Sequence, residues 1–167
     1  LVLERYQIDY LNDKSRFKSS LKTRQAGGSM MVSAAKFWTA ATTEFYRCDV
    51  MSVNLKEAKY KIKYIKDFYE TIPIRWRPQL VIDNTFSIGF HSGTRTSEIN
   101  SVAASSGIRG GSKDVFFDES ATLPKFDELF VSAVPAAVRG GKGFEQVFTP
   151  LGMSGGAWTI HTNQKTS

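Results

Sequence analysis

Residues 16–41, RFKSSLKTRQAGGSMMVSAAKFWTAA, are the most informative part of the sequence for the fold class, because their pattern predicts a strand, a glycine turn and a helix in succession. We expect a polar first strand over Arg16–Thr23, a turn over Gln25–Ser29 and a helix over Met30–Ala41. A strand that ends in such a turn and continues as a helix is typical of α/β domains with a mainly parallel sheet.

The rest of the chain repeats this alternation of short apolar runs and amphipathic segments. Asn54 is a favourable N-cap for the most regular helix, Leu55–Thr71, and Asp83–Thr85 separates two runs as a hairpin turn would. We expect further strands at 45–53, 80–82, 86–90, 99–104, 115–117 and 144–148, and further helices at 3–11, at 126–138 and from 154 onward. The sequence therefore predicts an α/β three-layer sandwich in one domain over residues 1–167. In the helix over 30–41, the spacing places Val32, Ala35 and Trp38 inward.

Composition excludes several classes of protein. With 167 residues and 41% hydrophobic content, the chain can bury a core. Cys48 is the single cysteine, so no internal disulfide is possible, and with two histidines a zinc site is not expected. No apolar run reaches the roughly 20 residues of a membrane span, and the N-terminus does not resemble a signal peptide. We expect a soluble, intracellular protein with no membrane partner.

Positive charge is concentrated in the first half of the chain. Residues 1–82 carry 15 lysines and arginines against 8 acidic residues, whereas residues 83–167 carry 7 against 8. Four lysines recur at helical spacing on one face of the helix over 55–71: Lys56, Lys59, Lys63 and Lys66. Such a face is either an ordinary solvated helix back or a ridge that contacts the phosphates of a polyanion.

The glycine turn after the first strand is a candidate phosphate-binding loop, residues 22–29, KTRQAGGS. Glycines allow backbone N–H groups to approach phosphates, and the following helix points its positive end at them. Compared with the Walker A pattern G-x-x-x-x-G-K-[ST], Gly27 fills the second glycine place and Ser29 the hydroxyl place. Gly28 stands where lysine is expected, and Lys22 stands at the first glycine.

Two further motifs follow apolar strands. Asp118 and Glu119 come directly after Val115–Phe117, an arrangement that places two carboxylates at the carboxyl edge of a sheet. Asp118 is the candidate Mg²⁺ ligand, as in the Walker B motif, and Glu119 the candidate base for a water that attacks a γ-phosphate. Thr149, before Pro150, ends the strand over 144–148.

In this order, the motifs resemble those of the N-terminal ATPase domain of the large terminase subunit, the DNA-packaging motor of tailed bacteriophages. Tyr6-Gln7 is similar to the adenine-recognition element of that family, and Thr23–Gly27 to its R-Q-x-G loop. Arg109-Gly110 followed by Asp118-Glu119 resembles the family's R-G…D-E arrangement. Ser52–Asn54 with Ala58 matches the segment after the second strand, and Thr149-Pro150-x-Gly152 its coupling motif.

The resemblance implies a P-loop NTPase fold of the ASCE type that binds ATP and Mg²⁺. Gln7 would recognise adenine, Ser29 and Asp118 would hold Mg²⁺, and Glu119 would activate water. Thr149 would report loss of the γ-phosphate, and Arg109 or Arg139 would complete the site of a neighbouring subunit. The phosphates would be held by Lys22, Arg24, Gln25, Ala26, Gly27, Gly28 and Ser29. Several terminases carry the loop lysine at the start of the loop, as Lys22 is here.

The resemblance also implies an activity and partners. ATP hydrolysis would be coupled to translocation of double-stranded DNA into a procapsid, in the cytoplasm of the host cell. The implied protein partners are the small terminase subunit, the portal and other copies of the chain in a ring. The nuclease domain that follows the ATPase in this family is absent from these 167 residues, so we expect an isolated motor domain.

Two alternatives remain open from the sequence. Because Gly28 removes a cation from the usual place, the chain could be a nucleotide-binding or assembly module with a degenerate P-loop and little hydrolysis. A helicase-like nucleic-acid ATPase would share the loop and the Asp-Glu pair. Two fused motor domains are expected in such a helicase, and 167 residues are too few for them.

Overall fold

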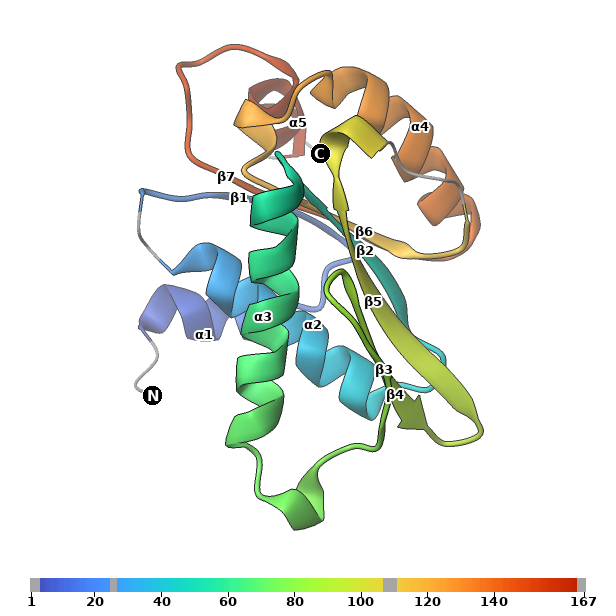
Figure 1. Cartoon of the computed structure of the whole chain (residues 1–167). Coiled ribbons are helices and arrows are strands. Elements are labelled where there is room, and N and C mark those ends of the chain that lie inside the picture. The colour runs from blue at the N-terminus through green and yellow to red at the C-terminus, as the bar shows by residue number, and fades with distance from the viewer. Residues whose placement is uncertain (1–3, 25–26, 107–110, 165–167) are drawn as a thin grey trace.

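The computed structural model describes residues 4–24, 27–106 and 111–164 (Figure 1). Seven strands form one sheet in the order β1-β7-β6-β2-β5-β4-β3. The strands are β1 (Phe17–Leu21), β2 (Arg47–Ser52), β3 (Leu80–Asp83), β4 (Ser87–Ser92), β5 (Arg95–Ala103), β6 (Asp114–Asp118) and β7 (Phe144–Phe148). The α-helices are α1 (Arg5–Asn12), α2 (Gly28–Thr42), α3 (Leu55–Thr71), α4 (Phe126–Arg139) and α5 (Gly156–Gln164). Short 3₁₀ helices are η1 (Ile74–Trp76), η2 (Ala104–Ser106) and η3 (Ser120–Thr122).

The sheet is parallel over five strands and antiparallel at one edge. Strands β1, β7, β6, β2 and β5 pair in parallel, and β3, β4 and β5 pair as an antiparallel meander. Parallel neighbours end at the same edge of the sheet, so the segments that follow β1, β6 and β7 meet there. The predicted mainly parallel α/β sheet and its hairpin are therefore confirmed.

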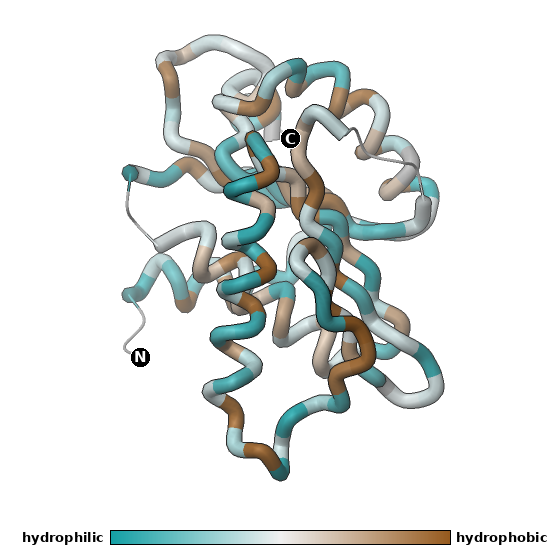
Figure 2. The backbone as a smooth tube through the Cα atoms, viewed as in Figure 1, coloured by the Kyte–Doolittle hydropathy of each residue, from teal (hydrophilic) through white to brown (hydrophobic). Residues whose placement is uncertain are grey.

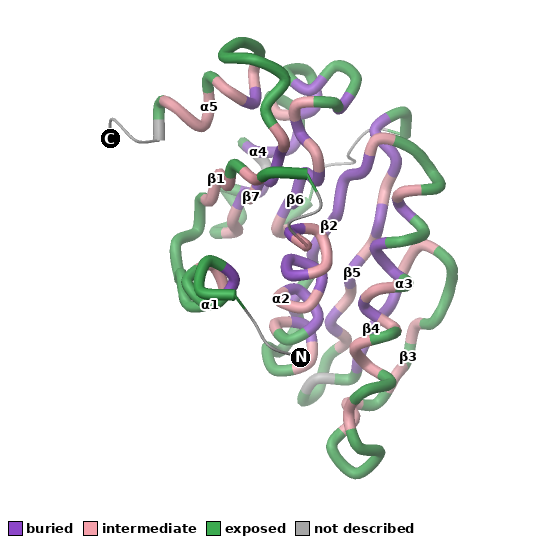
Figure 3. Tube along the Cα trace, turned by 90° about the vertical axis from the view of Figure 1, so that its left-hand side faces the viewer, coloured by how far each residue is buried: buried purple, intermediate pink, exposed green. Residues whose placement is uncertain are grey.

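Helices cover both faces of the sheet, which gives three layers. On one face, Phe116 packs with Val32 of α2 and Ile62 of α3. On the other, its neighbour Phe117 packs with Leu129 of α4. This alternation is the period of two expected for strands that are buried on both faces. In Figure 3 the central strands are correspondingly purple, the colour of buried residues.

Helix α3 has the predicted bounds, and its cap is the predicted one. The Asn54 side chain accepts a hydrogen bond from the Glu57 backbone N–H at 3.0 Å, which satisfies one free donor of the first turn. Ala58, Ile62 and Ile65 are buried on one face. Hydrophobic and hydrophilic residues alternate along this helix in Figure 2, as an amphipathic helix requires.

The inward face of α2 differs from the prediction. Trp38 was expected inside, but 66% of it is exposed, and Phe37 is buried instead, in an edge-to-face contact with Phe90. The cause is Lys36, which is buried and forms an ion pair with Glu145 of β7 at 2.7 Å. A lysine inside the helix face rotates the buried stripe by about one residue relative to the stripe inferred from apolar positions alone.

Candidate nucleotide site

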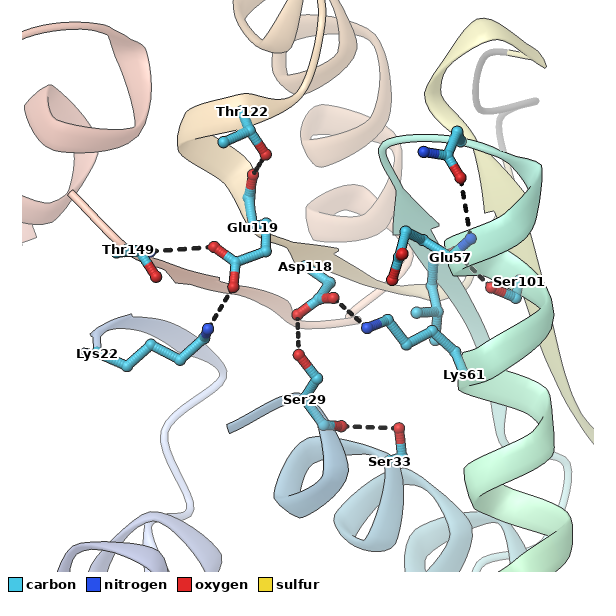
Figure 4. Close-up of polar contacts among 12 residues, drawn as sticks. Lys22, Ser29, Ser33, Glu57, Lys61, Ser101, Asp118, Glu119, Thr122 and Thr149 are labelled. Carbon is cyan, nitrogen blue, oxygen red and sulfur yellow. Dashed lines mark hydrogen bonds and ion pairs between the residues drawn. The ribbon is translucent and has the colours of Figure 1, made fainter. Parts of the chain in front are cut away.

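The three motifs of the sequence analysis lie together at the carboxyl edge of the sheet. Strand β7 is hydrogen-bonded between β1 and β6. Thr149 after β7 is therefore flanked by the loop after β1 and by Asp118 and Glu119 at the end of β6. Figure 4 shows Lys22, Ser29, Asp118, Glu119 and Thr149 pointing into one space. Ligands bind at this edge in open α/β sheets.

The glycine turn has the backbone that its sequence requires. Gly27 is the N-cap of α2 and has a φ of 67°, in the left-handed region, so a side chain there would be strained. Its carbonyl accepts the Met31 N–H at 2.9 Å and begins the helix. The first turn of α2 thus opens at the end of the loop, where its unpaired N–H groups can receive an anion.

Gly28 has a different function from Gly27, because it makes room for Lys22. A Cβ placed on Gly28 would lie 2.6 Å from Lys22 Cδ and 3.3 Å from Lys22 Cε. Side-chain carbons do not approach so closely, so a side chain at residue 28 would require the flexible Lys22 stem to shift from the position it has here. Gly28 therefore leaves room for Lys22 to lie across the start of α2.

Lys22 connects the loop to the candidate catalytic carboxylate. Its Nζ forms an ion pair with Glu119 Oε1, and Glu119 Oε2 accepts the Thr149 backbone N–H at 3.2 Å. Glu119 has a φ of 52° and a ψ of 47°, a left-handed conformation that costs a non-glycine residue about 1–3 kcal/mol. The Thr122 N–H and hydroxyl both donate to the Glu119 carbonyl at 2.8 Å and hold this turn.

Asp118 is buried next to the loop serine. Its Oδ1 accepts a hydrogen bond from Ser29 Oγ at 2.7 Å, and its Oδ2 forms an ion pair with Lys61 of α3. A loop hydroxyl beside a strand-end carboxylate is the donor set that holds Mg²⁺ in P-loop NTPases, with water and phosphate oxygens completing the shell. These residues fit that ion. Within the described ranges, no group of three or more His, Cys, Asp or Glu side chains could hold a metal ion, so the protein ligands here would be Ser29 and Asp118.

On its α1 side, the loop adjoins a small cavity. A volume of about 230 Å³ is lined by Tyr6, Tyr10, Ser20, Leu21, Lys22, Gly28, Met31 and Val147. Gln7 is 8% exposed, and its Nε2 lies 3.4 Å from where a Cβ of Gly27 would be. Its Oε1 accepts the Glu4 backbone N–H at 3.0 Å, which fixes the carboxamide beside the loop. Helix α1 thus places a planar amide and tyrosine rings beside the candidate phosphate-binding loop.

A buried charged network holds α1 in this place. Tyr10 donates from its hydroxyl to Glu145 Oε2 at 2.6 Å, and Lys36 pairs with Glu145 Oε1. Burial alone would raise the pKa of Glu145. The Lys36 charge and the hydrogen bonds from Lys36 and Tyr10 lower it by more than burial raises it, so the pKa of Glu145 lies below its ordinary value. Burial and the nearby Glu145 charge raise the pKa of Tyr10, so the hydroxyl stays protonated and donates.

Not every predicted site residue is shown to point into this space. Arg24 is in the loop at this edge, but it is exposed in the turn before Gly27. Arg139 is exposed at the end of α4, where Gly140 adjoins Ser112 shortly before β6 begins. Arg139 is therefore at the amino edge of the sheet, away from Glu119. Gln25, Ala26 and Arg109 lie outside the described residues.

Lys61, whose side chain is 5% exposed, is a site residue that the sequence pattern did not reveal. Lysines on α3 were interpreted as a solvated or phosphate-contacting ridge, but Lys61 is on the other face. It follows Ala58 by three positions and precedes Ile65 by four, so it falls within the apolar stripe. A lysine on an apolar stripe, with a carboxylate expected at the end of a nearby strand, was the available signal.

Comparison with solved structures identifies the fold. No protein-family model matches the sequence, and no curated protein matches it either. The ATPase domain of the Thermus phage P74-26 large terminase superimposes with a TM-score of 0.73, 14% identity and coverage of 92% of this chain and 67% of that one. The chain has the fold of phage large terminase ATPase domains.

Two further structures of large terminases are similar to this chain. The large terminase of a thermophilic bacteriophage gives a TM-score of 0.80 at 12% identity and covers 99% of this chain. Another structure of that terminase, in complex with ATP-gamma-S, gives 0.63 at 15% identity and covers 91%. This chain spans 44% and 39% of those two proteins. Within the described ranges, no helix is both long and apolar enough to cross a membrane.

Proposed function

We propose that the chain is the ATPase motor domain of a viral terminase large subunit, which couples Mg-ATP hydrolysis to translocation of double-stranded DNA into a procapsid. The observation that carries the proposal is the constellation at the end of β1, β6 and β7: the glycine loop, the Ser29–Asp118 pair and the Lys22–Glu119–Thr149 contacts. The shared fold with large terminases, one of them in complex with ATP-gamma-S, supports it.

Each residue has a chemical role in this proposal. The loop N–H groups and Lys22 bind the phosphates, and Gln7 orients the adenine beside α1. Ser29 and Asp118 hold Mg²⁺, which when bound neutralises charge on the β- and γ-phosphate oxygens. Glu119 accepts the proton of the attacking water. Thr149, tied to Glu119 through its N–H, senses the state of that carboxylate at the end of β7.

In the absence of nucleotide, Lys22 forms an ion pair with the candidate catalytic carboxylate, Glu119. While Lys22 holds Glu119 Oε1 and the Thr149 N–H donates to Oε2, both carboxylate oxygens are engaged and neither is free to contact a water. A triphosphate carries several negative charges and attracts Lys22 more strongly than one carboxylate does. Binding of ATP would therefore move the cation to the phosphates and release Glu119 for catalysis.

In this proposal, DNA contacts a groove on α3, here called the lysine groove. This groove has a volume of about 450 Å³ and is lined by Lys56, Lys59, Tyr60, Ile62, Lys63, Lys66 and Thr85. Lys63 is paired with Asp67 and Lys66 with Asp83. No carboxylate of the described residues is recorded in an ion pair with Lys56 or Lys59. These two lysines are therefore the stronger candidates for phosphate contacts.

The remaining assignments follow from the same proposal. Residues 1–167 form one ATPase domain that works in a homo-oligomeric ring with the portal and the small terminase subunit. Arg139 or Arg109 acts in the site of the next subunit, where a cation stabilises charge on the transferred phosphoryl group.

The test is steady-state ATP hydrolysis by Glu119→Gln with and without double-stranded DNA. Because the amide cannot accept a proton, turnover is expected to fall by about 10²-fold or more while ATP binding is retained. Glu128→Gln, at an exposed position in α4, is the matched control and is expected to leave turnover unchanged. Equal turnover in Glu119→Gln and the parent would remove Glu119 from the mechanism.

A further inference from the structure

Lys61 is a buried cation that α3 does not need for its own packing. The apolar residues Ala58, Ile62 and Ile65 already attach the helix to the sheet. Burial of an ammonium group costs several kcal/mol unless a partner compensates it, and a leucine or methionine would pack without that cost. The compensating partner is Asp118, whose side chain is also 5% exposed. The burial of a lysine at position 61 is therefore explained by its ion pair with Asp118.

The two oxygens of Asp118 are both engaged. Ser29 Oγ donates to Oδ1, and Lys61 binds Oδ2 (Figure 4). Asp118 and Ser29 are the residues that fit Mg²⁺. An ammonium on the same carboxylate repels a divalent cation and supplies the charge that this cation would supply. The ammonium group and the metal are therefore competitors for one buried carboxylate.

Lys61 also has a second carboxylate nearby, that of Glu57. Its side chain is a flexible four-carbon stem, in contrast to a fixed backbone donor. Glu57 lies one turn earlier in α3, at the i,i+4 spacing at which glutamate and lysine form a pair. In Figure 4 the Glu57 side chain points to the same side of α3 as Lys61. The cation can leave Asp118 without being left unpaired.

We propose that Lys61 is a removable counter-ion of Asp118, which holds the carboxylate in the metal-free state and gives it up to Mg²⁺. This rests on the proposed function, because that function assigns the metal to Asp118. Lys61 is thus a positioning residue: it keeps a buried carboxylate folded and oriented before nucleotide arrives, and it weakens binding of free metal without phosphates.

The test is a titration of the nucleotide-free chain with Mn²⁺, followed by electron paramagnetic resonance. Lys61→Met removes the competitor and is expected to tighten Mn²⁺ binding about tenfold or more, because close charge pairs couple by at least roughly this much. Lys61→Arg keeps a cation that can form two hydrogen bonds with the Asp118 carboxylate, so this variant is expected to bind Mn²⁺ more weakly than the parent. Lys125→Met, at an exposed lysine just before α4 and outside every proposed site, is the control and should match the parent.

Opposite shifts in the two variants support the proposal. Mn²⁺ affinity that is unchanged or lower in Lys61→Met would overturn it and leave Lys61 a structural ion-pair partner. If Lys61→Met does not fold, Lys61→Arg carries the test, since unchanged or tighter Mn²⁺ binding there overturns the proposal equally. Asp118-dependent Mn²⁺ binding in the presence of ATP is a separate readout. Its absence in the parent would overturn the proposed function itself.

Discussion

The steric relation between Lys22 and Gly28 predicts how the phosphate loop responds to substitution. Lys22→Ala removes the one loop cation that the geometry brings to Glu119. A charge-assisted contact is worth about 1.5–3 kcal/mol. We therefore expect ATP binding to weaken by about 10–100-fold.

Restoring the Walker A lysine tests the geometry itself. In Gly28→Lys the new Cβ would stand 2.6 Å from Lys22 Cδ, so the two lysines compete for one space and binding should not improve. In the double variant Lys22→Ala/Gly28→Lys that space is free, and a lysine approaches the same phosphates from the helix side. The double variant is expected to recover much of the affinity that Lys22→Ala loses.

Isothermal titration calorimetry with a non-hydrolysable ATP analogue measures all three variants. Lys125→Ala, at an exposed lysine before α4, is the control and should bind like the parent. Parent-like affinity in Lys22→Ala would show that Lys22 does not bind phosphate. A double variant no tighter than Lys22→Ala would refute the steric account of Gly28.

Three further predictions concern stability, DNA and the core. Glu145→Gln should lower the free energy of unfolding by about 3 kcal/mol, because it leaves Lys36 buried and unpaired; denaturant unfolding measures this, and a loss under 1 kcal/mol would contradict it. The pKa of Glu145 is lower in the folded chain than its unfolded value of about 4.3. The stability that this pair contributes is therefore fully present above the unfolded pKa and is lost gradually as the pH falls from there through the folded pKa. Lys56→Ala/Lys59→Ala should reduce the log–log salt slope of DNA binding by about 2, whereas Lys125→Ala/Lys142→Ala should not; equal slopes would return the lysine groove to an ordinary solvated surface. Burial raises the pKa of Cys48 to about 12, so its thiol should react with Ellman's reagent at pH 8 only after unfolding, and rapid labelling of the folded chain would contradict the core packing.

Elements that depend on local pattern were predictable from the sequence. The bounds of α3 and β7 match the prediction, since a cap residue and a helical stripe specify the first and a short apolar run the second. Strand β5 is longer than predicted, because Arg95–Ser97 pairs with β4, beyond the residues of β5 that also pair with β2. The length of a strand depends on its partners, which the local sequence does not name.

The polar interior was the part that sequence patterns did not predict. Lys36 and Lys61 are buried because Glu145 and Asp118, both distant in sequence, compensate them. Helical spacing treats lysine as a surface residue, and this assumption also produced the wrong orientation of Trp38. The loop and the Asp-Glu pair were predictable as motifs, whereas the Lys22–Glu119 contact and the left-handed Glu119 backbone required the tertiary structure.

If the residues at the end of β1, β6 and β7 hydrolyse ATP in a metal-dependent reaction, the purified chain should release phosphate from ATP. We expect this release to require Mg²⁺, to increase with double-stranded DNA and to be lost in Asp118→Asn, which no longer offers the metal a carboxylate. The measurement should span protein concentrations that favour assembly, so that a neighbouring arginine can take part. Phosphate release no greater than that of Asp118→Asn, from a parent that binds ATP, would show that the chain does not hydrolyse ATP and is a nucleotide-binding module.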